Sequence, residues 1–370
     1  MAFELPPYPY DLLNPFREKA ERHKEGVVDL SVGTPCDPPP AAVINALSES
    51  ESERGYPKSI GSLDYLRACA EWLERRFGVE VSVNDSLAGC IGTKEFVASV
   101  PSDLRLANPE KDTVLYPSVS YPSYAMGAEL AGCRSIPIPV DSNLKMDLEQ
   151  VSDEDAERSL MVWINSPSNP TGVLEDLTQA ARWGRKRNIP VFSDECYAEF
   201  TWSMEPQTIL NEGIDGVVAV HSLSKRSNLA GLRAGFYAGD SNIIHWLREV
   251  RKHAGKMIPG PVQAAAVHAF RDDNHVDVQR NLYIERLKFL KECFEKLGFS
   301  VSLPEGAFYL WIRSEEKNCW EIVEELSNKV GVLVTPGTFF GEACTDYVRV
   351  AAVQEMSKLS LLKERISKLS

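Results

Sequence analysis

Short apolar runs alternate with helical patterns over most of the 370-residue chain, and this alternation restricts the possible fold more than any other feature of the sequence. Segment 63–77 spaces its apolar residues three and four apart, as an amphipathic helix does, and segment 177–187 is a second helical stretch. Strand and helix in alternation predict an α/β fold built on a mostly parallel sheet. The predicted buried strands are short, rich in β-branched or aromatic residues, and bounded by polar residues, glycine or proline: 113–116, 160–164, 189–192, 217–220 and 234–238.

From about residue 246 the pattern changes to long helical stretches around short strands, which predicts a second, smaller α+β domain. Before residue 39 the chain has a short helical pattern and one strand at 27–32, and this segment is compatible with either domain. The predicted elements after residue 246 are helices over 276–297, 318–330 and 356–369 and strands over 307–312 and 347–351.

Charge and cysteine usage exclude several classes of protein. The 40 Lys+Arg against 53 Asp+Glu give a net charge of −13, whereas nucleic-acid-binding proteins usually carry a basic footprint. The eight cysteines form no CxxC pair and the six histidines form no HExxH motif, so we expect neither a disulfide framework nor a metal. The first residues lack the basic and apolar regions of a signal peptide, and no uncharged stretch is long enough to span a bilayer. We therefore expect a soluble, cytoplasmic protein that binds neither nucleic acid nor membrane.

Three polar segments directly follow predicted strands, at 165–172, 193–197 and 221–225. In parallel sheets, ligands bind beyond the carboxyl ends of the strands. The sequence therefore places a candidate site where these three segments meet.

Lys225 follows the predicted strand 217–220 in the sequence Ser222-Leu-Ser-Lys225. Burial at such a position lowers the pKa of a lysine and makes it a nucleophile. A solvated loop lysine is the alternative. The Ser-x-x-Lys spacing also occurs in acyl-enzymes of the β-lactamase type, but the SDN and KTG elements of that class do not follow it in this sequence.

Asp194 and Tyr197 follow the predicted strand 189–192, and the pair fits a carboxylate for a heterocyclic N–H and a hydroxyl for a phenolate oxygen. A helix-capping aspartate beside a structural tyrosine is the alternative. Segment 165–172, Asn-Ser-Pro-Ser-Asn-Pro-Thr-Gly, holds two prolines and a glycine. This composition predicts a tight loop in which one X-Pro bond is cis, with or without a function.

Gly92-Thr-Lys94 stands at the start of a helical pattern and resembles a turn that binds phosphate through backbone N–H groups. It lacks the GxxxxGK[ST] spacing of a nucleotide-binding P-loop. Tyr121, beside a proline, fits either stacking on a flat ring or ordinary packing. Arg349 is flanked by strand-forming residues and requires a carboxylate partner, and a substrate carboxylate and a structural acid satisfy that need equally.

Taken together, these motifs resemble the fold-type I pyridoxal-phosphate aminotransferases of the aspartate aminotransferase superfamily over nearly the whole chain. The resemblance implies a three-layer αβα large domain over residues 40–255, a small α+β domain formed by 1–39 and 256–370, and a homodimer with shared active sites. It rests on an ordered set of residues: Gly33, Tyr56, Gly92-Thr-Lys94, Tyr121, Asn169-Pro-Thr-Gly172, Asp194, Tyr197, Ser222, Lys225, Arg233 and Arg349.

The resemblance also implies a role for each of these residues. Lys225 would bond pyridoxal 5'-phosphate and shuttle the substrate's Cα proton, and Asp194 would pair with the pyridinium N–H. Arg349 and the backbone of Gly33 would hold the substrate α-carboxylate, with Asn169 also reaching the substrate. The remaining contacts would be made to the cofactor's phosphate by Thr93, Lys94, Ser222, Arg233 and, from the neighbouring subunit, Tyr56; to its ring oxygen O3′ by Tyr197 and Asn169; and to its ring face by Tyr121.

Within this family the motifs are especially similar to the actinobacterial N-succinyldiaminopimelate aminotransferases of lysine biosynthesis. This similarity implies amino-group transfer between glutamate/2-oxoglutarate and N-succinyl-2-amino-6-ketopimelate. Aspartate, alanine and aromatic aminotransferases are the nearest alternatives, and a pyridoxal-phosphate lyase and a non-enzymatic protein that keeps the fold are more distant ones. The candidates for the substrate's further carboxylates are Lys94, Arg226, Lys252 and Lys256, and no role is evident for Cys196.

Overall fold

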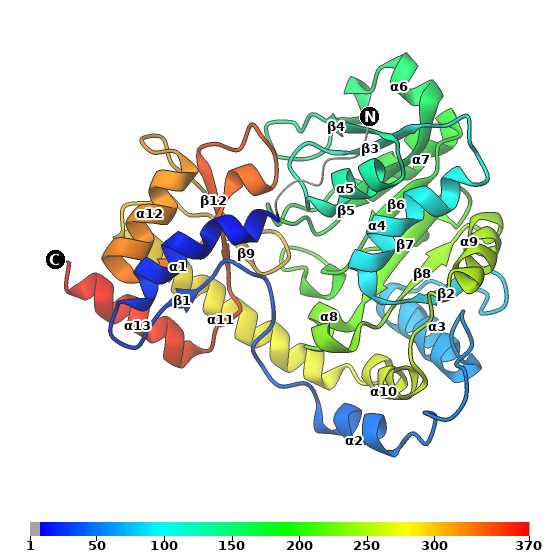
Figure 1. The fold of residues 1–370 in the computed structure, drawn as a ribbon, viewed down its shortest axis with the longest axis horizontal. Coiled ribbons are helices and arrows are strands. Elements are labelled where there is room, and N and C mark those ends of the chain that lie inside the picture. The colour runs from blue at the N-terminus through cyan, green and yellow to red at the C-terminus, as the bar shows by residue number, and fades with distance from the viewer. Residues whose placement is uncertain (1–7, 370) are drawn as a thin grey trace. The chain divides into compact units, whose positions relative to one another are not determined.

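A seven-stranded sheet forms the centre of the larger of two compact units in the computed structural model, which describes residues 8–369 (Figure 1). The strand order is β2-β8-β7-β6-β5-β3-β4. Every neighbouring pair from β7 to β4 is parallel, whereas β8 runs antiparallel to both β7 and β2. This arrangement confirms the predicted α/β fold with a mostly parallel sheet. The strands are β2 (Leu87–Cys90), β3 (Thr113–Pro117), β4 (Arg134–Ile138), β5 (Ser159–Asn165), β6 (Val191–Asp194), β7 (Val217–Ser222) and β8 (Gly235–Gly239).

All five strands predicted for this sheet are present, within about two residues of their expected ends. Two further strands, β2 and β4, were not predicted. The β2 sequence Leu-Ala-Gly-Cys lacks β-branched residues, and Pro137 interrupts the pattern of β4, which tolerates the proline because it lies at the edge of the sheet.

Alternate residues of the central strands enter two different hydrophobic clusters, one on each face of the sheet. On β7, Val217 and Ala219 belong to the cluster that holds Trp72, whereas Val218 and Val220 belong to the cluster that holds Phe96. Helices α3, α7 and α10 contribute side chains to the first cluster, and α4, α5 and α9 contribute to the second. Because successive strand residues point to opposite faces, this division confirms the expected three-layer arrangement of helices on both sides of the sheet.

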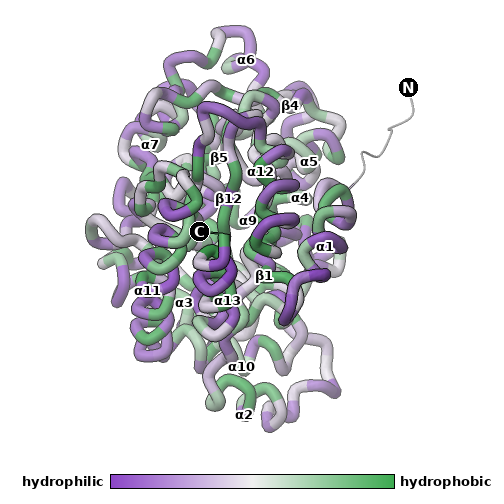
Figure 2. The backbone as a smooth tube through the Cα atoms, turned by 90° about the vertical axis from the view of Figure 1, so that its left-hand side faces the viewer, coloured by the Kyte–Doolittle hydropathy of each residue, from purple (hydrophilic) through white to green (hydrophobic). Residues whose placement is uncertain are grey.

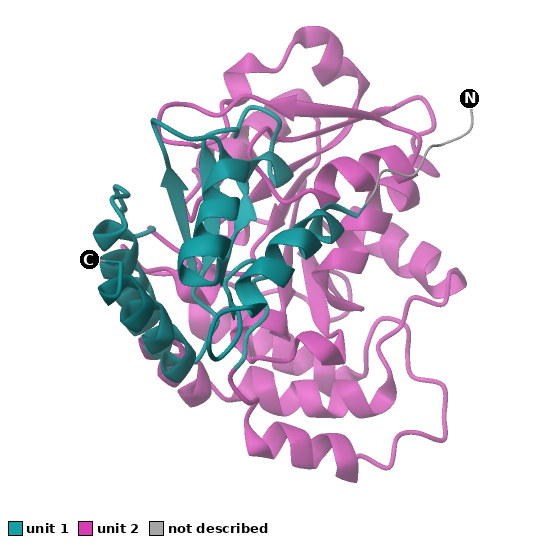
Figure 3. Cartoon of the chain, turned by 60° about the vertical axis from the view of Figure 1, so that its left-hand side comes forward, with its two compact units in different colours: residues 1–36, 282–304, 308–370 teal, residues 37–281, 305–307 magenta. Residues whose placement is uncertain are grey.

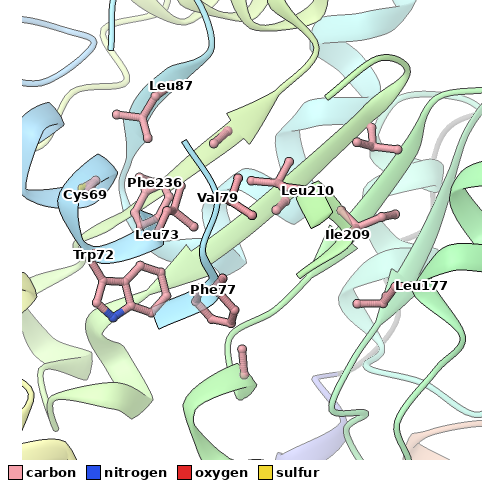
Figure 4. Packing of buried hydrophobic residues seen from close by; sticks show 14 of the residues in the cluster. Cys69, Trp72, Leu73, Phe77, Val79, Leu87, Leu177, Ile209, Leu210 and Phe236 are labelled. Carbon is pink, nitrogen blue, oxygen red and sulfur yellow. The ribbon is translucent and has the colours of Figure 1, made fainter. Parts of the chain in front are cut away.

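The α-helices that lie wholly in the larger unit vary from four to fifteen residues. Figure 4 shows side chains of the first cluster, with Trp72, Leu73 and Phe77 of α3 near Phe236 of β8. The α-helices are α2 (Ala41–Glu49), α3 (Leu63–Phe77), α4 (Gly92–Arg105), α5 (Ser123–Leu130), α6 (Asp153–Arg158), α7 (Leu177–Arg187), α8 (Leu223–Arg226), α9 (Ser241–His253) and α10 (Gly260–Arg271), and the 3-10 helices are η2 (Leu148–Gln150), η3 (Ala198–Phe200), η4 (Ile209–Glu212) and η5 (Ala230–Leu232).

Helix α3 begins and ends where the sequence predicts because both of its ends are capped. Ser62 accepts a hydrogen bond from Tyr65 N (3.2 Å) at the N-terminus, and Gly78 adopts φ +68° just after the last turn. Between these caps, the buried residues fall on one face of the helix and include Leu66, Leu73 and Trp72.

The smaller unit has a three-stranded antiparallel sheet, β11-β12-β9, and a separate parallel pair, β1 with β10. Strand β9 begins two residues later than predicted, because Ala307 adopts φ +58°, outside the β region. This unit confirms the predicted second α+β region. Its elements are η1 (Pro9–Leu13), α1 (Asn14–Glu21), β1 (Val28–Asp29), β9 (Tyr309–Arg313), α12 (Cys319–Val330), β10 (Val332–Leu333), β11 (Thr335–Pro336), η6 (Gly337–Phe339), β12 (Tyr347–Ala351) and α13 (Met356–Ser367), and α11 (Asn274–Lys296) runs from the larger unit into it.

The boundary between the units differs from the expected division at residue 255. The larger unit comprises residues 37–281 and 305–307, and the smaller comprises 1–36, 282–304 and 308–370 (Figure 3). Residues 256–281 therefore belong with the sheet, because α10 packs against α2 and α3 and places Val262, Ala266 and Phe270 in the first hydrophobic cluster.

Hydrophobic residues concentrate on strands such as β5 and β12, while exposed helices alternate between polar and apolar positions (Figure 2). Across residues 8–369, no helix combines the length and apolar character required to cross a bilayer.

Candidate active site

Strand register brings the polar segments of the sequence to one edge of the sheet. Asn165 lies opposite Asp194 where β5 and β6 end, and Asp194 lies opposite Val220 of β7. Two residues later β7 ends at Ser222 and leads directly into α8, which carries Lys225. The parallel sheet therefore gathers the candidate residues from three separate segments, as the sequence predicts.

Asp194 is a buried carboxylate with two hydrogen-bond donors. Its Oδ2 accepts from the Tyr124 hydroxyl (2.9 Å), and its Oδ1 accepts from the Cys196 backbone N–H (3.3 Å). Burial raises the pKa of Asp194, and the hydrogen bonds from Cys196 and Tyr124 act against that rise. A carboxylate that is destabilised by desolvation is stabilised when a cationic N–H donates to it. Asp194 is therefore suited to pair with the N–H of a protonated heterocycle.

Lys225 lies on a helix of only four residues. Ser222 caps that helix by accepting from Ser224 N (3.0 Å), and the Lys225 side chain is half-buried. Burial and the Asp194 charge raise the pKa of the Cys196 thiol, while the charge of Lys225 lowers it, which places the lysine in the same electrostatic neighbourhood as Asp194 and Cys196.

The N-terminus of α4 forms a cradle for an anion. Gly92 adopts φ +71°, and a Cβ at this position would lie 2.3 Å from Arg233 Nη2, so only glycine fits. Arg233 donates through Nη1 to Ser224 Oγ (3.4 Å) and through Nη2 to Ile91 O (3.3 Å). A guanidinium, hydroxyls and the amides of a 14-residue helix thus meet around Thr93, which is the donor set that a phosphate requires.

The loop after β5 is fixed by its own polar side chains. Asn165 Nδ2 donates to Asp194 O (2.7 Å), and Asn165 Oδ1 accepts from Asn169 N (2.8 Å). Both Ser166–Pro167 and Asn169–Pro170 are cis peptide bonds, where one was expected. The loop therefore holds Asn169 close to the end of β6.

Tyr121 and Tyr197 lie in the larger unit with the other candidate residues. The ring of Tyr121 meets that of Tyr124 edge to face, with centroids 5.9 Å apart, and Tyr124 is in turn bonded to Asp194. Tyr197 is buried and directly precedes η3, three residues after Asp194.

Four predicted residues remain to be described. Tyr56, between α2 and α3, is fully exposed, and Lys94 is exposed in the first turn of α4. Gly33 and Arg349 belong to the smaller unit, where Arg349 donates to Ser31 O (2.6 Å).

Arg349 is buried among aromatic rings. Its guanidinium lies 4.4 Å from the ring centroid of Tyr309 and 4.6 Å from that of Phe340, and Nη2 donates to the Tyr10 hydroxyl (3.3 Å). The Tyr309 hydroxyl fills the space in which Gly33 would carry a Cβ, at 2.1 Å. Arg349 and Gly33 are therefore neighbours through Tyr309.

The sequence analysis missed two residues of the site. Tyr124 holds Asp194, and its only signal in the sequence is a position one helical turn after Tyr121. Cys196, for which no role was evident, donates through Sγ to Thr93 Oγ1 (3.0 Å) and so joins the Asp194 segment to the start of α4. Within residues 8–369, no group of His, Cys, Asp or Glu side chains is arranged to hold a metal ion.

Comparisons with known proteins agree on the family. Residues 25–366 match the family model for aminotransferases of class I and II. The chain is 40% identical to the 4-dedimethylamino-4-oxo-anhydrotetracycline transaminase OxyQ of Streptomyces rimosus, over 98% of this chain and 99% of that protein. It is 33% identical to the LL-diaminopimelate aminotransferase of Aquifex aeolicus, over 99% and 97%. A solved structure of a probable N-succinyldiaminopimelate aminotransferase from Thermus thermophilus is similar with a TM-score of 0.88 and 29% identity, over 98% of this chain and 100% of that one.

The bond from Tyr124 to Asp194 predicts a pH-dependent loss of affinity for pyridoxal phosphate in Tyr124→Phe. Without this donor the pKa of Asp194 rises further, so the carboxylate is protonated at higher pH and pairs less well with a cationic ring. We expect the dissociation constant of the variant, relative to the unsubstituted protein, to rise about tenfold at pH 6 and by less at pH 8. Absorbance titration of the apoprotein measures it. Tyr116→Phe, which loses a bond to Ser135 Oγ on the edge strand β4, is the control, and equal ratios at both pH values would contradict the prediction.

A second buried acid, Glu195, faces His221 with Oε2 3.2 Å from Nε2. Burial raises the pKa of Glu195 to about 7 and lowers that of His221 to about 3. Between the ordinary pKa of a glutamate and about pH 7, the native state keeps a proton on Glu195 that the unfolded chain has lost, so this group makes stability fall as the pH rises. The contribution of His221 to the pH dependence of stability has the opposite sign. Between about pH 3 and its ordinary pKa, this side chain is protonated in the unfolded chain and neutral in the native state, so stability rises with pH.

We therefore compare the free energy of unfolding of Glu195→Gln with that of the unsubstituted protein. The difference should shift in favour of the variant by about 1 kcal/mol when the pH is raised from 6 to 8. The amide still accepts the hydrogen bond that Ile209 N donates to Oε1 (2.8 Å). Thermal unfolding at the two pH values measures the change, with the exposed Glu205→Gln as the control for removing a carboxylate. A stability difference that is the same at both pH values would refute the shifted titration of Glu195.

Proposed function

This chain belongs to the family of class I and II aminotransferases, and on that premise we propose that it transfers an amino group between glutamate/2-oxoglutarate and N-succinyl-2-amino-6-ketopimelate. Aminotransferases of this family use pyridoxal phosphate and act on amino acids and keto acids. The observation that supports the amino-transfer chemistry is the convergence of the strand ends on Asp194, Lys225 and the anion cradle at the start of α4.

Each residue at the carboxyl edge of the sheet would have a separate role in the reaction. Pyridoxal phosphate, when bound, supplies a ring that delocalises the electrons of a broken Cα–H bond. Asp194 would hold the proton on the ring nitrogen, and Lys225 Nζ would take the substrate's Cα proton and return it at the cofactor's C4′. The helix N-terminus at Thr93 would bind the phosphate together with Ser222 and Arg233.

Arg349 would bind the substrate's α-carboxylate beside Gly33, because its guanidinium is buried and held in a fixed orientation by Tyr309 and Phe340. Of the four cations considered for the further carboxylates, three are engaged by acids of this chain: Arg226 by Glu199, Lys252 by Glu249 and Lys256 by Asp103. Lys94 is exposed in the first turn of α4, next to the amides proposed to bind the phosphate, and this position at the site edge makes it the candidate for a further carboxylate.

The finer choice of substrate rests on motif similarity and on relatives whose names contain diaminopimelate. A specific observation favours a second candidate, an aromatic or polycyclic substrate. Tyr10, Phe339 and Trp320 form a chain of rings with centroids 5.5 and 5.7 Å apart, beginning at the Tyr10 hydroxyl that Arg349 contacts. The relative from Streptomyces rimosus is named as a transaminase of 4-dedimethylamino-4-oxo-anhydrotetracycline, a polycyclic compound.

We also propose a cytoplasmic homodimer. As the resemblance to the family implies, Tyr56 would reach the phosphate of the neighbouring subunit, and its full exposure leaves the side chain available for that contact. All eight cysteines are free thiols, which suits a reducing compartment.

A half-reaction screen tests the substrate assignment. The holoprotein is mixed with one amino donor at a time, and the cofactor absorbance is followed as it changes to that of the amine form. We expect rapid conversion by glutamate and N-succinyl-diaminopimelate, about tenfold faster or more than by aspartate or alanine, because alanine has no further carboxylate for the additional cation and the one of aspartate lies one methylene nearer to Cα. Faster conversion by phenylalanine or tyrosine would favour the aromatic candidate, and formation of a keto acid without glutamate formation from 2-oxoglutarate would identify a lyase instead.

A further inference from the structure

Arg226 directly follows Lys225 and is a buried cation with partners on several segments. Nε donates to Glu199 Oε1 (3.0 Å), and Nη2 donates to Asp273 Oδ1 (2.6 Å). Nη1 donates to Ala269 O (2.6 Å) near the end of α10. Because one guanidinium saturates acceptors from separate segments, the end of α8 is fixed in position and in orientation.

Glu199 is the matching anion, and it lies two residues after Tyr197 in η3. Besides Arg226, it accepts from Trp72 Nε1 (2.8 Å) and from Arg76 Nε (3.0 Å), both on α3. Figure 4 shows Trp72 among the side chains of the first hydrophobic cluster, so the hydrogen-bonded indole connects Glu199 to the rigid core. The guanidinium of Arg226 lies 5.5 Å from the ring centroid of Trp72 as well.

The two elements joined by this ion pair are too short to be rigid by themselves. Helix α8 has four residues and η3 has three, whereas an isolated helix in water requires about 12–15 residues before it is even marginally stable. Ser222 holds α8 at one end, and Arg226 holds it at the other. The separation of Lys225 from Tyr197 therefore depends on the contact between Arg226 and Glu199.

Stability alone does not account for this buried pair. Charges removed from water pay a desolvation penalty, and an apolar pair of similar volume would often stabilise a fold equally well. Burial lowers the pKa of Arg226 while Glu199 and Asp273 act against the shift, so the guanidinium keeps its charge. Apolar packing would not fix the orientation of α8 relative to η3, whereas the directional, charged contact between Arg226 and Glu199 does.

We propose that Arg226 and Glu199 are positioning residues that set the geometry of Lys225 against Tyr197, and thereby the turnover number and the pH at which the bound cofactor changes its absorbance. This proposal rests on the proposed function, in which Lys225 carries the cofactor. Both side chains are buried and bonded to groups of this chain, so we expect binding of the amino donor to be unaffected. Arg226 is thus removed from the candidates for the substrate's distal carboxylates.

The test uses Arg226→Met, Arg226→Lys, Glu199→Gln and the double variant Arg226→Met with Glu199→Gln, each as the holoprotein. In Arg226→Met we expect the pH midpoint of the cofactor absorbance to move by about half a unit or more, and kcat to fall about tenfold with KM for the amino donor within about twofold. Arg226→Lys should shift the midpoint less and keep more of kcat than Arg226→Met does, because lysine keeps the positive charge. The double variant should be no worse than the more affected single variant, since both remove the same contact.

Arg75→Met is the matched control. Arg75 donates to the same Asp273 carboxylate (Nε to Oδ2, 2.6 Å) and to Phe270 O (2.7 Å), so its loss weakens the same network and leaves the contact between Arg226 and Glu199 in place. We expect this variant to keep the midpoint and kcat of the unsubstituted protein.

An unchanged midpoint in both Arg226→Met and Glu199→Gln, with only a lower melting temperature, would overturn the positioning role. Glu199→Gln keeps an acceptor for Trp72 and so provides the answer if Arg226→Met does not fold. The midpoint is read without substrate, which separates the two proposals: an unsubstituted protein that shows no cofactor absorbance overturns the proposed function, whereas a normal absorbance that does not respond to the substitutions overturns this inference alone.

Discussion

Burial of the Asp194 carboxylate is the constraint on which the arrangement of the larger unit's site depends. An ionised carboxylate removed from water costs several kcal/mol unless donors or a cation compensate it. Tyr124 from α5 and the Cys196 backbone supply two donors, yet the pKa of Asp194 stays above its ordinary value, so the compensation is incomplete. A protonated ring nitrogen would complete it, which is the partner that we propose for this buried carboxylate at the end of β6.

Attraction of anions to the proposed site must come from groups close to it and not from the net charge of the chain. The chain carries a net charge of −13, so long-range attraction does not favour a phosphate cofactor or anionic substrates. We propose that attraction comes instead from the N-terminus of α4, from Arg233 and from the buried Arg349, each of which is fixed by contacts within its own unit. Behind the strand ends, Arg226 and Glu199 connect the two short segments that carry Lys225 and Tyr197 to the hydrophobic core. The charged pair that holds these two segments is thus supported by apolar packing on one face of the sheet.

Sequence patterns predicted most of the fold because its elements are locally determined. Helix α3 was predicted at its observed bounds since Ser62 and Gly78 cap it, and β7 was recognisable because four apolar residues precede its polar end. Strand β2 was missed because its Gly89 and Ala88 give no strand signal, and residues 256–281 were assigned to the wrong unit because packing of α10 on α3 is a tertiary contact. In the site, Lys225, Asp194 and Asn169 were accessible from motifs, whereas the bonds from Tyr124 to Asp194 and from Cys196 to Thr93 join residues 70 and 103 positions apart and leave no local pattern.

The most direct measurement is the identity of the residue that carries the cofactor. Reduction of the holoprotein with borohydride makes the bond between pyridoxal phosphate and its lysine permanent, and mass spectrometry of the digested chain then locates the modified side chain. The structure predicts a single modified peptide that contains Lys225, at the end of β7 and beside Asp194. Modification at another lysine, such as the exposed Lys94, or absence of any modified peptide after incubation with the cofactor, would contradict the assignment of this edge of the sheet as the active site.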